Sequence, residues 1–134
     1  MAGRSERYDE GMRMRRRVLG DAYVDAALSR REIIGGEFQQ LVTEYVWGEV
    51  WTRDALPAKT RSLITVALLA ALGQTEELGL HVGGAVRNGC TPGEIEEALM
   101  HAGAYCGASA TATAFRAANR ALKEMAAAGR PATS

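Results

Sequence analysis

Residues 56–92 read LPAKTRSLITVALLAALGQTEELGLHVGGAVRNGCTP, and this stretch decides the fold. Its pattern predicts two successive helices. The first runs from Pro57, a residue suited to the first helical position, to Gly73 and is apolar on almost every side. The second begins with Thr75 as its N-cap and ends at Asn88. The apolar run 63–72 is shorter than the roughly 20 residues of a membrane span, so we expect a buried core helix.

The rest of the chain also reads as helices separated by short breaks. Helices are expected at about 6–19, 22–31, 37–51, 92–106 and 109–125, with Ser5 as the first N-cap and a capping box at Thr91 and Glu94. Residues 126–134 are expected to be a flexible tail. The sequence therefore predicts a single all-α domain, residues 1–134, of about seven helices.

Composition narrows the function classes. The chain has 134 residues, 47% of them hydrophobic, which is typical of one globular domain. Its 16 basic and 16 acidic residues argue against a binder of nucleic acid or membranes. The N-terminus has no apolar run typical of a signal peptide, and Cys90 and Cys106 have no metal-ligand spacing, so we expect a cytoplasmic protein without a metal. The basic cluster Arg13 and Arg15–Arg17 is either a solvated helix end or a contact to a neighbouring subunit or an anionic substrate.

The helix at 37–51 has two apolar faces, which predicts that it is sandwiched between layers or at a subunit contact. At about 100° per residue, Tyr45 shares one face with Glu49, and Trp47 and Trp51 lie on the opposite one. The first face also holds Phe38, Leu41 and Val42. A carboxylate on an apolar face needs a partner or becomes protonated. Glu49 therefore either meets an arginine or water with its head group, or acts as a protonated proton donor.

Two further polar residues border apolar faces of the central helices. Arg61 shares with Ile64, Thr65, Leu68 and Leu72 a face that we expect to point toward the core, so it needs an internal carboxylate or the carboxylate of a substrate. His81 lies one turn after Glu77, which would orient the imidazole and raise its basicity. The alternative for His81 is a purely structural role.

Four stretches of the chain together resemble a known family: 18–28, 44–56 with its WGEVW segment, 61–99, and 105–115. The chain is similar to the gamma-carboxymuconolactone decarboxylases of the protocatechuate branch of the 3-oxoadipate pathway. These belong to the alkylhydroperoxidase D-like superfamily. The resemblance implies an all-helical, alkylhydroperoxidase D-like fold and a homo-oligomer, commonly a trimer or a hexamer.

The resemblance also implies an activity and roles for the candidate residues. The activity is that of a carboxy-lyase that converts 4-carboxymuconolactone to 3-oxoadipate enol-lactone, without a cofactor because the lactone carbonyl accepts the electrons. Arg61 would hold the retained carboxylate, and His81, oriented by Glu77, would stabilise the enolate or deliver the proton. Glu49 is the rival proton donor. The residues expected to line the pocket are Tyr45 and Trp47.

Two segments depart from the patterns of the superfamily. Its peroxidase branch carries CxxC followed by a histidine, and the matching positions here are Gln74, Glu77 and His81, so thiol-dependent peroxide reduction is not expected. The decarboxylases usually show a segment closer to YAGVPAA where this chain has YCGASAT at 105–111. The alternatives are therefore an enzyme for a related lactone or oxoacid, a non-catalytic oligomeric module and a redox protein.

Overall fold

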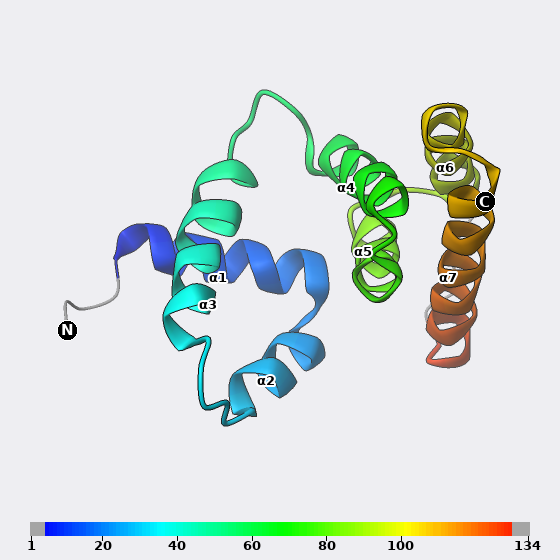
Figure 1. The fold of residues 1–134 in the computed structure, drawn as a ribbon. Helices are drawn as coiled ribbons and strands as arrows, with labels where there is room; N and C mark the ends of the chain where they lie inside the picture. Colours follow the sequence, from blue (N-terminus) through cyan, green and yellow to red (C-terminus); the bar gives the residue numbers. More distant parts are fainter. Residues whose placement is uncertain (1–4, 130–134) are drawn as a thin grey trace. The chain divides into compact units, whose positions relative to one another are not determined.

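The computed structural model describes residues 5–129, and all regular elements among them are helical (Figure 1). These residues form seven α-helices and one π-helical segment, which confirms the predicted all-α class of about seven helices. The chain divides into two compact units, one ending at Leu56 and the other beginning at Pro57. Within residues 5–129, no helix has both the length and the hydropathy required to cross a membrane.

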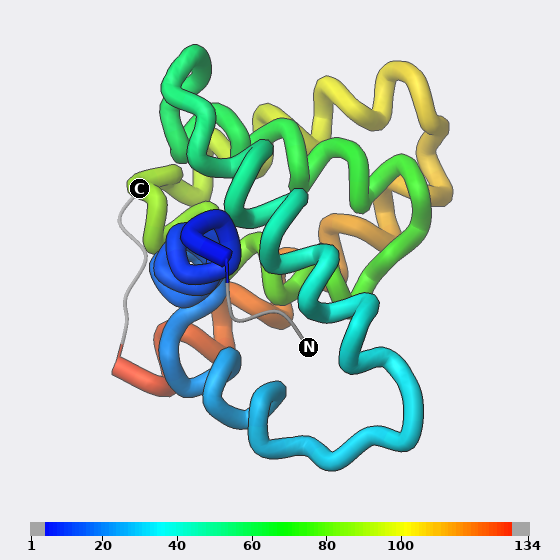
Figure 2. Tube along the Cα trace, turned by 90° about the vertical axis from the view of Figure 1, so that its left-hand side faces the viewer, coloured from blue at the N-terminus to red at the C-terminus, as the bar shows by residue number. Residues whose placement is uncertain are grey.

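The first unit contains α1 (Glu6–Leu19), α2 (Asp21–Ser29), α3 (Gly36–Val42) and the π-helix η1 (Thr43–Val50). As predicted, Ser5 caps α1, with its Oγ accepting from the backbone N–H of Tyr8 at 3.0 Å. The chain trace runs from α3 into η1 without a break (Figure 2). The packing of α1 against η1 holds this unit together.

The regular α-helix predicted for 37–51 is wrong in its second half. The N–H of Trp51 donates to the carbonyl of Val46, five residues back, at 2.9 Å, which is the π-helical pattern. The predicted face angles of 100° per residue therefore do not apply beyond Val42. The contact with α1 lies on the side of Thr43 and Gly48, where a Cβ added at Gly11 would overlap the carbonyl oxygen of Thr43. The face with Phe38, Leu41 and Tyr45 is exposed in the single chain, so the subunit contact that the sequence left open for it stays a prediction.

The second unit contains α4 (Ala58–Leu72), α5 (Thr75–Arg87), α6 (Pro92–Cys106) and α7 (Ala108–Ala127). The capping box at Thr91 and Glu94 is confirmed. Thr75 is the first residue of α5 rather than its N-cap, which is Gln74 without a side-chain hydrogen bond. Because α7 continues to Ala127, the predicted tail begins too early. Its last residues, 130–134, lie outside the described part of the chain.

Small side chains let α5 and α7 approach closely. A Cβ added at Gly79 would lie 3.9 Å from the Cβ of Ala121, which is an ordinary packing distance. The buried core of this unit includes four alanines of α7 and apolar residues of the other helices: Val66, Ala70, Leu78, Val82, Ala85, Cys90, Ile95, Leu99, Ala114, Ala117, Ala118 and Ala121. Tight contact along this interface excludes water from the middle of α5.

The core-facing side of α4 was predicted wrongly. The buried residues of α4 are Ser62, Val66 and Ala70. The face that Arg61 shares with Ile64, Leu68 and Leu72 is exposed, with those three side chains 44%, 57% and 69% accessible. Ser62 is buried because its Oγ accepts a hydrogen bond from Asn88 Nδ2 at 3.0 Å, next to α5. The inner side of α4 therefore combines a hydrogen-bonded hydroxyl with Val66 and Ala70, and the partly buried Leu63 and Leu69 also pack against the core.

The crossing of α1 and η1 predicts a position-specific effect of added methyl groups. Gly11→Ala should lower the free energy of unfolding by about 1–3 kcal/mol or more, because the new Cβ meets the backbone of η1. Gly79→Ala, with room for its Cβ, should instead raise it by up to about 1 kcal/mol through helix propensity. Urea unfolding followed by circular dichroism measures both. Equal stabilities of the two variants would contradict the close crossing.

Candidate active site

The predicted site residues are divided between the two units. The first unit holds Tyr45, Trp47 and Glu49, all on η1. The second holds Arg61 on α4, and Glu77 and His81 on α5.

His81 is a buried polar residue in the middle of α5. It is 9% exposed, and its neighbours along the helix, from Leu78 to Ala85, include several of the most buried residues of the unit. Burial lowers the pKa of His81 from its ordinary value of 6.5 to about 4, because the cationic form loses its hydration. At neutral pH the imidazole is therefore uncharged, with one nitrogen that donates a hydrogen bond and one that accepts.

The predicted increase in the basicity of His81 is wrong. Glu77 is exposed on the outer side of the first turn of α5, whereas His81 is buried one turn later. The desolvation of the imidazole lowers its pKa, in the direction opposite to the one expected from a flanking carboxylate. The role of Glu77 in orienting the ring stays a prediction.

Arg61 lies half-buried in the first turn of α4, beside the exposed apolar stripe of that helix. The hydroxyl of Thr65 donates a hydrogen bond to the backbone carbonyl of Arg61 at 2.8 Å. The next residue, Ser62, forms the hydrogen bond with Asn88 that ties the start of α4 to the end of α5. From the sequence, Asn88 was predicted only to end α5, so its hydrogen bond to Ser62 was not expected. Its Oδ1 is buried and accepts no hydrogen bond from the described residues 5–129.

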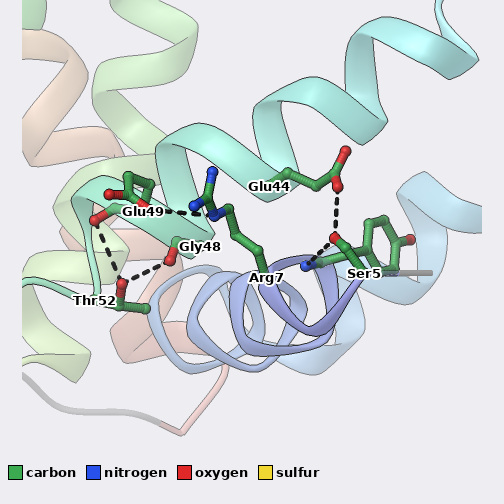
Figure 3. A network of polar contacts seen from close by, with 7 residues as sticks. Ser5, Arg7, Glu44, Gly48, Glu49 and Thr52 are labelled. Carbon is green, nitrogen blue, oxygen red and sulfur yellow. Dashed lines mark hydrogen bonds and ion pairs between the residues drawn. The ribbon is translucent and has the colours of Figure 1, made fainter.

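Glu49 forms an ion pair with Arg7 of α1, with Oε2 3.2 Å from Nε (Figure 3). Of the two alternatives for this carboxylate, the structure therefore shows the arginine partner. The Glu49 side chain is 44% exposed, and the pair borders an open cleft of about 630 Å³. The same surface holds a short hydrogen bond from Ser5 Oγ to Glu44 Oε2, at 2.6 Å (Figure 3).

The aromatic residues of η1 differ in burial. Trp47 and Trp51 are 5% and 7% exposed, and their rings stack with centroids 5.2 Å apart. Their predicted apolar face is therefore confirmed as buried. Tyr45 is 63% exposed and presents its ring on the outer side of the helix. Of the two candidate pocket residues on η1, Trp47 is thus buried and Tyr45 is exposed.

A smaller cleft of about 220 Å³ lies in the second unit, where α4 ends and where α5 and α7 begin. Three hydroxyl side chains and several apolar groups surround it, so it suits a small molecule that is mostly apolar. The lining residues are Leu69, Ala70, Gly73, Thr75, Leu78, Ser109, Ala110, Thr113 and Ala114.

Comparison with known proteins gives a consistent set of similarities. Residues 36–120 match the model of the carboxymuconolactone decarboxylase family. A 4-carboxymuconolactone decarboxylase of Acinetobacter baylyi is 37% identical over 120 residues, which cover 90% of each chain. Nitrosuccinic acid decarboxylase npaB of Metarhizium robertsii is 41% identical over 118 residues, 88% of this chain and 82% of the relative. A 4-carboxymuconolactone decarboxylase of Pseudomonas putida is 48% identical over 44 residues, 33% of this chain and 92% of the relative.

The buried histidine predicts how stability depends on pH. The pKa of His81 is about 4 in the folded chain and about 6.5 in the unfolded one, so between these values the unfolded chain binds more protons. Above about pH 6.5, the neutral His81 does not reduce the free energy of unfolding. As the pH falls to about 4, protonation of the unfolded chain lowers this free energy by about 3 kcal/mol. Urea unfolding at the two ends of this range should show that the free energy of unfolding depends less on pH in His81→Gln than in the wild type. His101→Gln, at an exposed histidine, is the control. An unchanged pH dependence in His81→Gln would contradict the burial of a neutral imidazole.

Proposed function

Because this chain belongs to the carboxymuconolactone decarboxylase family, we propose that it decarboxylates 4-carboxymuconolactone to 3-oxoadipate enol-lactone in the catabolism of aromatic compounds such as protocatechuate. The observation that carries the proposal is the 37% identity to a protein of that activity, which extends over 90% of both chains. The enzyme is a carboxy-lyase and acts in the cytoplasm.

The reaction sets clear requirements for the protein. When the carboxylate leaves as CO₂, the electrons of the broken bond move through the ring double bond onto the lactone carbonyl oxygen. A proton then reaches the far carbon and gives the enol-lactone. Because the substrate accepts the electrons itself, no cofactor is required. The protein supplies a cation for the retained carboxylate, a hydrogen-bond donor for the enolate oxygen, a desolvated place for the departing carboxylate and an acid for the carbon.

Arg61 is the cation that holds the retained carboxylate. A guanidinium binds a carboxylate through two parallel hydrogen bonds, which fixes the orientation of the substrate as well as its position. The half-buried place of Arg61 supports this role, because a partly desolvated cation attracts an anion more strongly than one in open water. The apolar residues Ile64 and Leu68 on the same face suit the ring of a lactone.

His81 acts as an uncharged hydrogen-bond donor to the enolate oxygen. Of the two roles that the sequence left open, this one fits a buried imidazole whose pKa is about 4. Delivery of a proton to carbon requires the imidazolium, which is scarce at neutral pH for such a group. Glu77 is a positioning residue that orients the ring of His81 from one turn earlier in α5.

Glu49 is the acid that protonates the carbon. In this chain its carboxylate is paired with Arg7, so this role requires the pair to open and the carboxylate to take up a proton from water before it delivers that proton to the carbon. The exposed position of the pair makes this opening inexpensive, since ion pairs in contact with water contribute little stability. Trp47 and Tyr45, on the same π-helix, line the pocket.

The 41% identity to a nitrosuccinic acid decarboxylase favours a second candidate substrate class. A nitro group accepts electrons from a breaking carbon–carboxylate bond just as the lactone carbonyl does. Nitrosuccinate also has a second carboxylate, which remains after CO₂ has left. Both substrates therefore require the same cation and the same hydrogen-bond donor in the protein. The common class is a carboxylic acid that carries its own electron acceptor and a second carboxylate.

The chain assembles as a homo-oligomer, a trimer or a hexamer. The exposed apolar side chains of α4 support this proposal, because Ile64, Leu68 and Leu72 form one stripe that is unusual on a monomer. The exposed Phe38 and Leu41 of α3 offer a second apolar surface.

Replacement of His81 or Arg61 should separate chemistry from binding. With 4-carboxymuconolactone, His81→Ala should lower kcat at least about tenfold through the lost hydrogen bond to the enolate, and Arg61→Leu should mainly raise KM. The measurement follows CO₂ release and enol-lactone formation, with 2-nitrosuccinate assayed in parallel and His101→Ala as control. An unchanged kcat in folded His81→Ala would remove His81 from the mechanism. A change only in thermal stability would make Arg61 structural.

The proposed assembly depends on the stripe of α4. Leu68→Asp should reduce the mass measured by light scattering toward that of one chain, because a carboxylate cannot be buried in an apolar interface without a partner. Glu96→Gln, at an exposed position of α6, serves as the control. A wild-type protein with the mass of one chain would refute the assembly, and an intact oligomer in Leu68→Asp would place the interface elsewhere.

A further inference from the structure

A cleft of about 950 Å³ lies within the first unit, and it includes none of the six residues assigned a role above. Its walls come from α1, α2, the segment 30–35, α3 and Thr43 at the start of η1. Four charged residues line it: Arg15, Arg30, Arg31 and Glu32. The excess of arginine makes the cleft electropositive.

Arg15 is the unusual member of this set. It is 7% exposed, and it has no hydrogen bond or ion pair to any of residues 5–129. Its neighbour Arg16 instead pairs with Asp21 at 3.0 Å and with Asp25 at 2.8 Å. Of the alternatives that the sequence left open for the basic cluster, the solvated helix end describes the exposed Arg13 and Arg17 but not the buried Arg15.

Arg15 is a largely buried cation whose remaining exposure lies beside the cleft, and such a position requires an explanation. Removing a cation from water is costly unless an anion or several acceptors replace the water. Arginine keeps its charge in proteins, so it does not avoid this cost by losing a proton. A cleft that borders such a group is therefore a place where an anion would bind with a large gain in stability.

The other walls of the cleft indicate which anion fits. Glu32 is the single carboxylate among the lining residues, and its Oε1 lies 3.8 Å from Nε of Arg30. Arg31, like Arg15, has no ion pair within residues 5–129, so positive charge remains in excess. Leu28 and Ile34, which are 52% and 85% exposed, add apolar surface beside these charges. This combination suits an organic anion with an apolar body better than a small inorganic ion.

We propose that this cleft binds the carboxylate group of a small organic acid, and that Arg15 holds it through paired hydrogen bonds. The guanidinium presents two parallel N–H donors that match the two oxygens of a carboxylate. Leu28 and Ile34 cover the carbon chain. The site is distinct from Arg61 and does not depend on the proposed decarboxylation.

The test uses adipate, a stable six-carbon dicarboxylate, and observes the methyl signals of Ile34 by NMR. Adipate should shift the Ile34 signal in a saturable way in the wild type, with no shift at Ile95 in the second unit. Arg15→Met should weaken this binding at least about tenfold, since a charge-assisted pair of hydrogen bonds is lost. Arg17→Met, at an exposed arginine of the same helix, should bind adipate as the wild type does.

Three controls separate this site from others. Arg61→Leu should retain the adipate shift at Ile34, which shows that the signal does not report the proposed substrate site. The uncharged adipamide should not compete, and inorganic phosphate should compete only weakly. Without adipate, Arg15→Met should be about as stable as the wild type, because it replaces a largely desolvated cation with an apolar side chain of similar length. The proposal is overturned by an absence of saturable binding, by equal affinity in Arg15→Met, by phosphate binding as tightly as adipate, or by a marked loss of stability in Arg15→Met.

Discussion

The packing of α5 against α7 through small side chains is the interaction on which the second unit depends. Glycine on α5 and alanine on α7 let the two backbones approach, so that the segment from Leu78 to Ala85 is almost completely buried. A polar residue in that segment loses its water. His81 is such a residue, and the loss of hydration on burial lowers its pKa to about 4.

This environment suits a reaction in which the substrate accepts its own electrons. A buried, uncharged imidazole offers a directed hydrogen bond without bringing a positive charge that would hold the departing carboxylate in place. The cation that we propose for the retained carboxylate, Arg61, lies on α4, where it is half-buried beside apolar side chains. The two relatives with different substrates, a lactone acid and a nitro acid, are consistent with a protein that recognises the electronic pattern of the substrate.

Most features that depend on neighbouring residues could be predicted from the sequence, with the N-cap at Thr75 as an exception, and those that depend on distant residues could not. Ser5 and the Thr91–Glu94 box cap their helices as expected, because capping is decided within one turn. The inner face of α4 was missed, because that helix is apolar all round and Ser62 is buried by a bond to Asn88, 26 residues away. The π-helical form of η1 accompanies a backbone contact with Gly11, and Glu49 is paired with Arg7. Both partners lie more than 30 residues away along the chain, so the sequence around η1 does not indicate them. The pKa of His81 was predicted in the wrong direction because Glu77 is visible in the sequence and desolvation is not.

We propose that the candidate site works with an uncharged, buried His81. The most direct measurement is the ¹⁵N chemical shifts of the two imidazole nitrogens, recorded by NMR across the pH range in which the protein is folded. We expect the pattern of one protonated and one bare nitrogen from neutral pH down to about pH 5, with conversion to the cation only near the folded pKa of about 4. A titration of His81 with its midpoint near the ordinary value of 6.5 would contradict it.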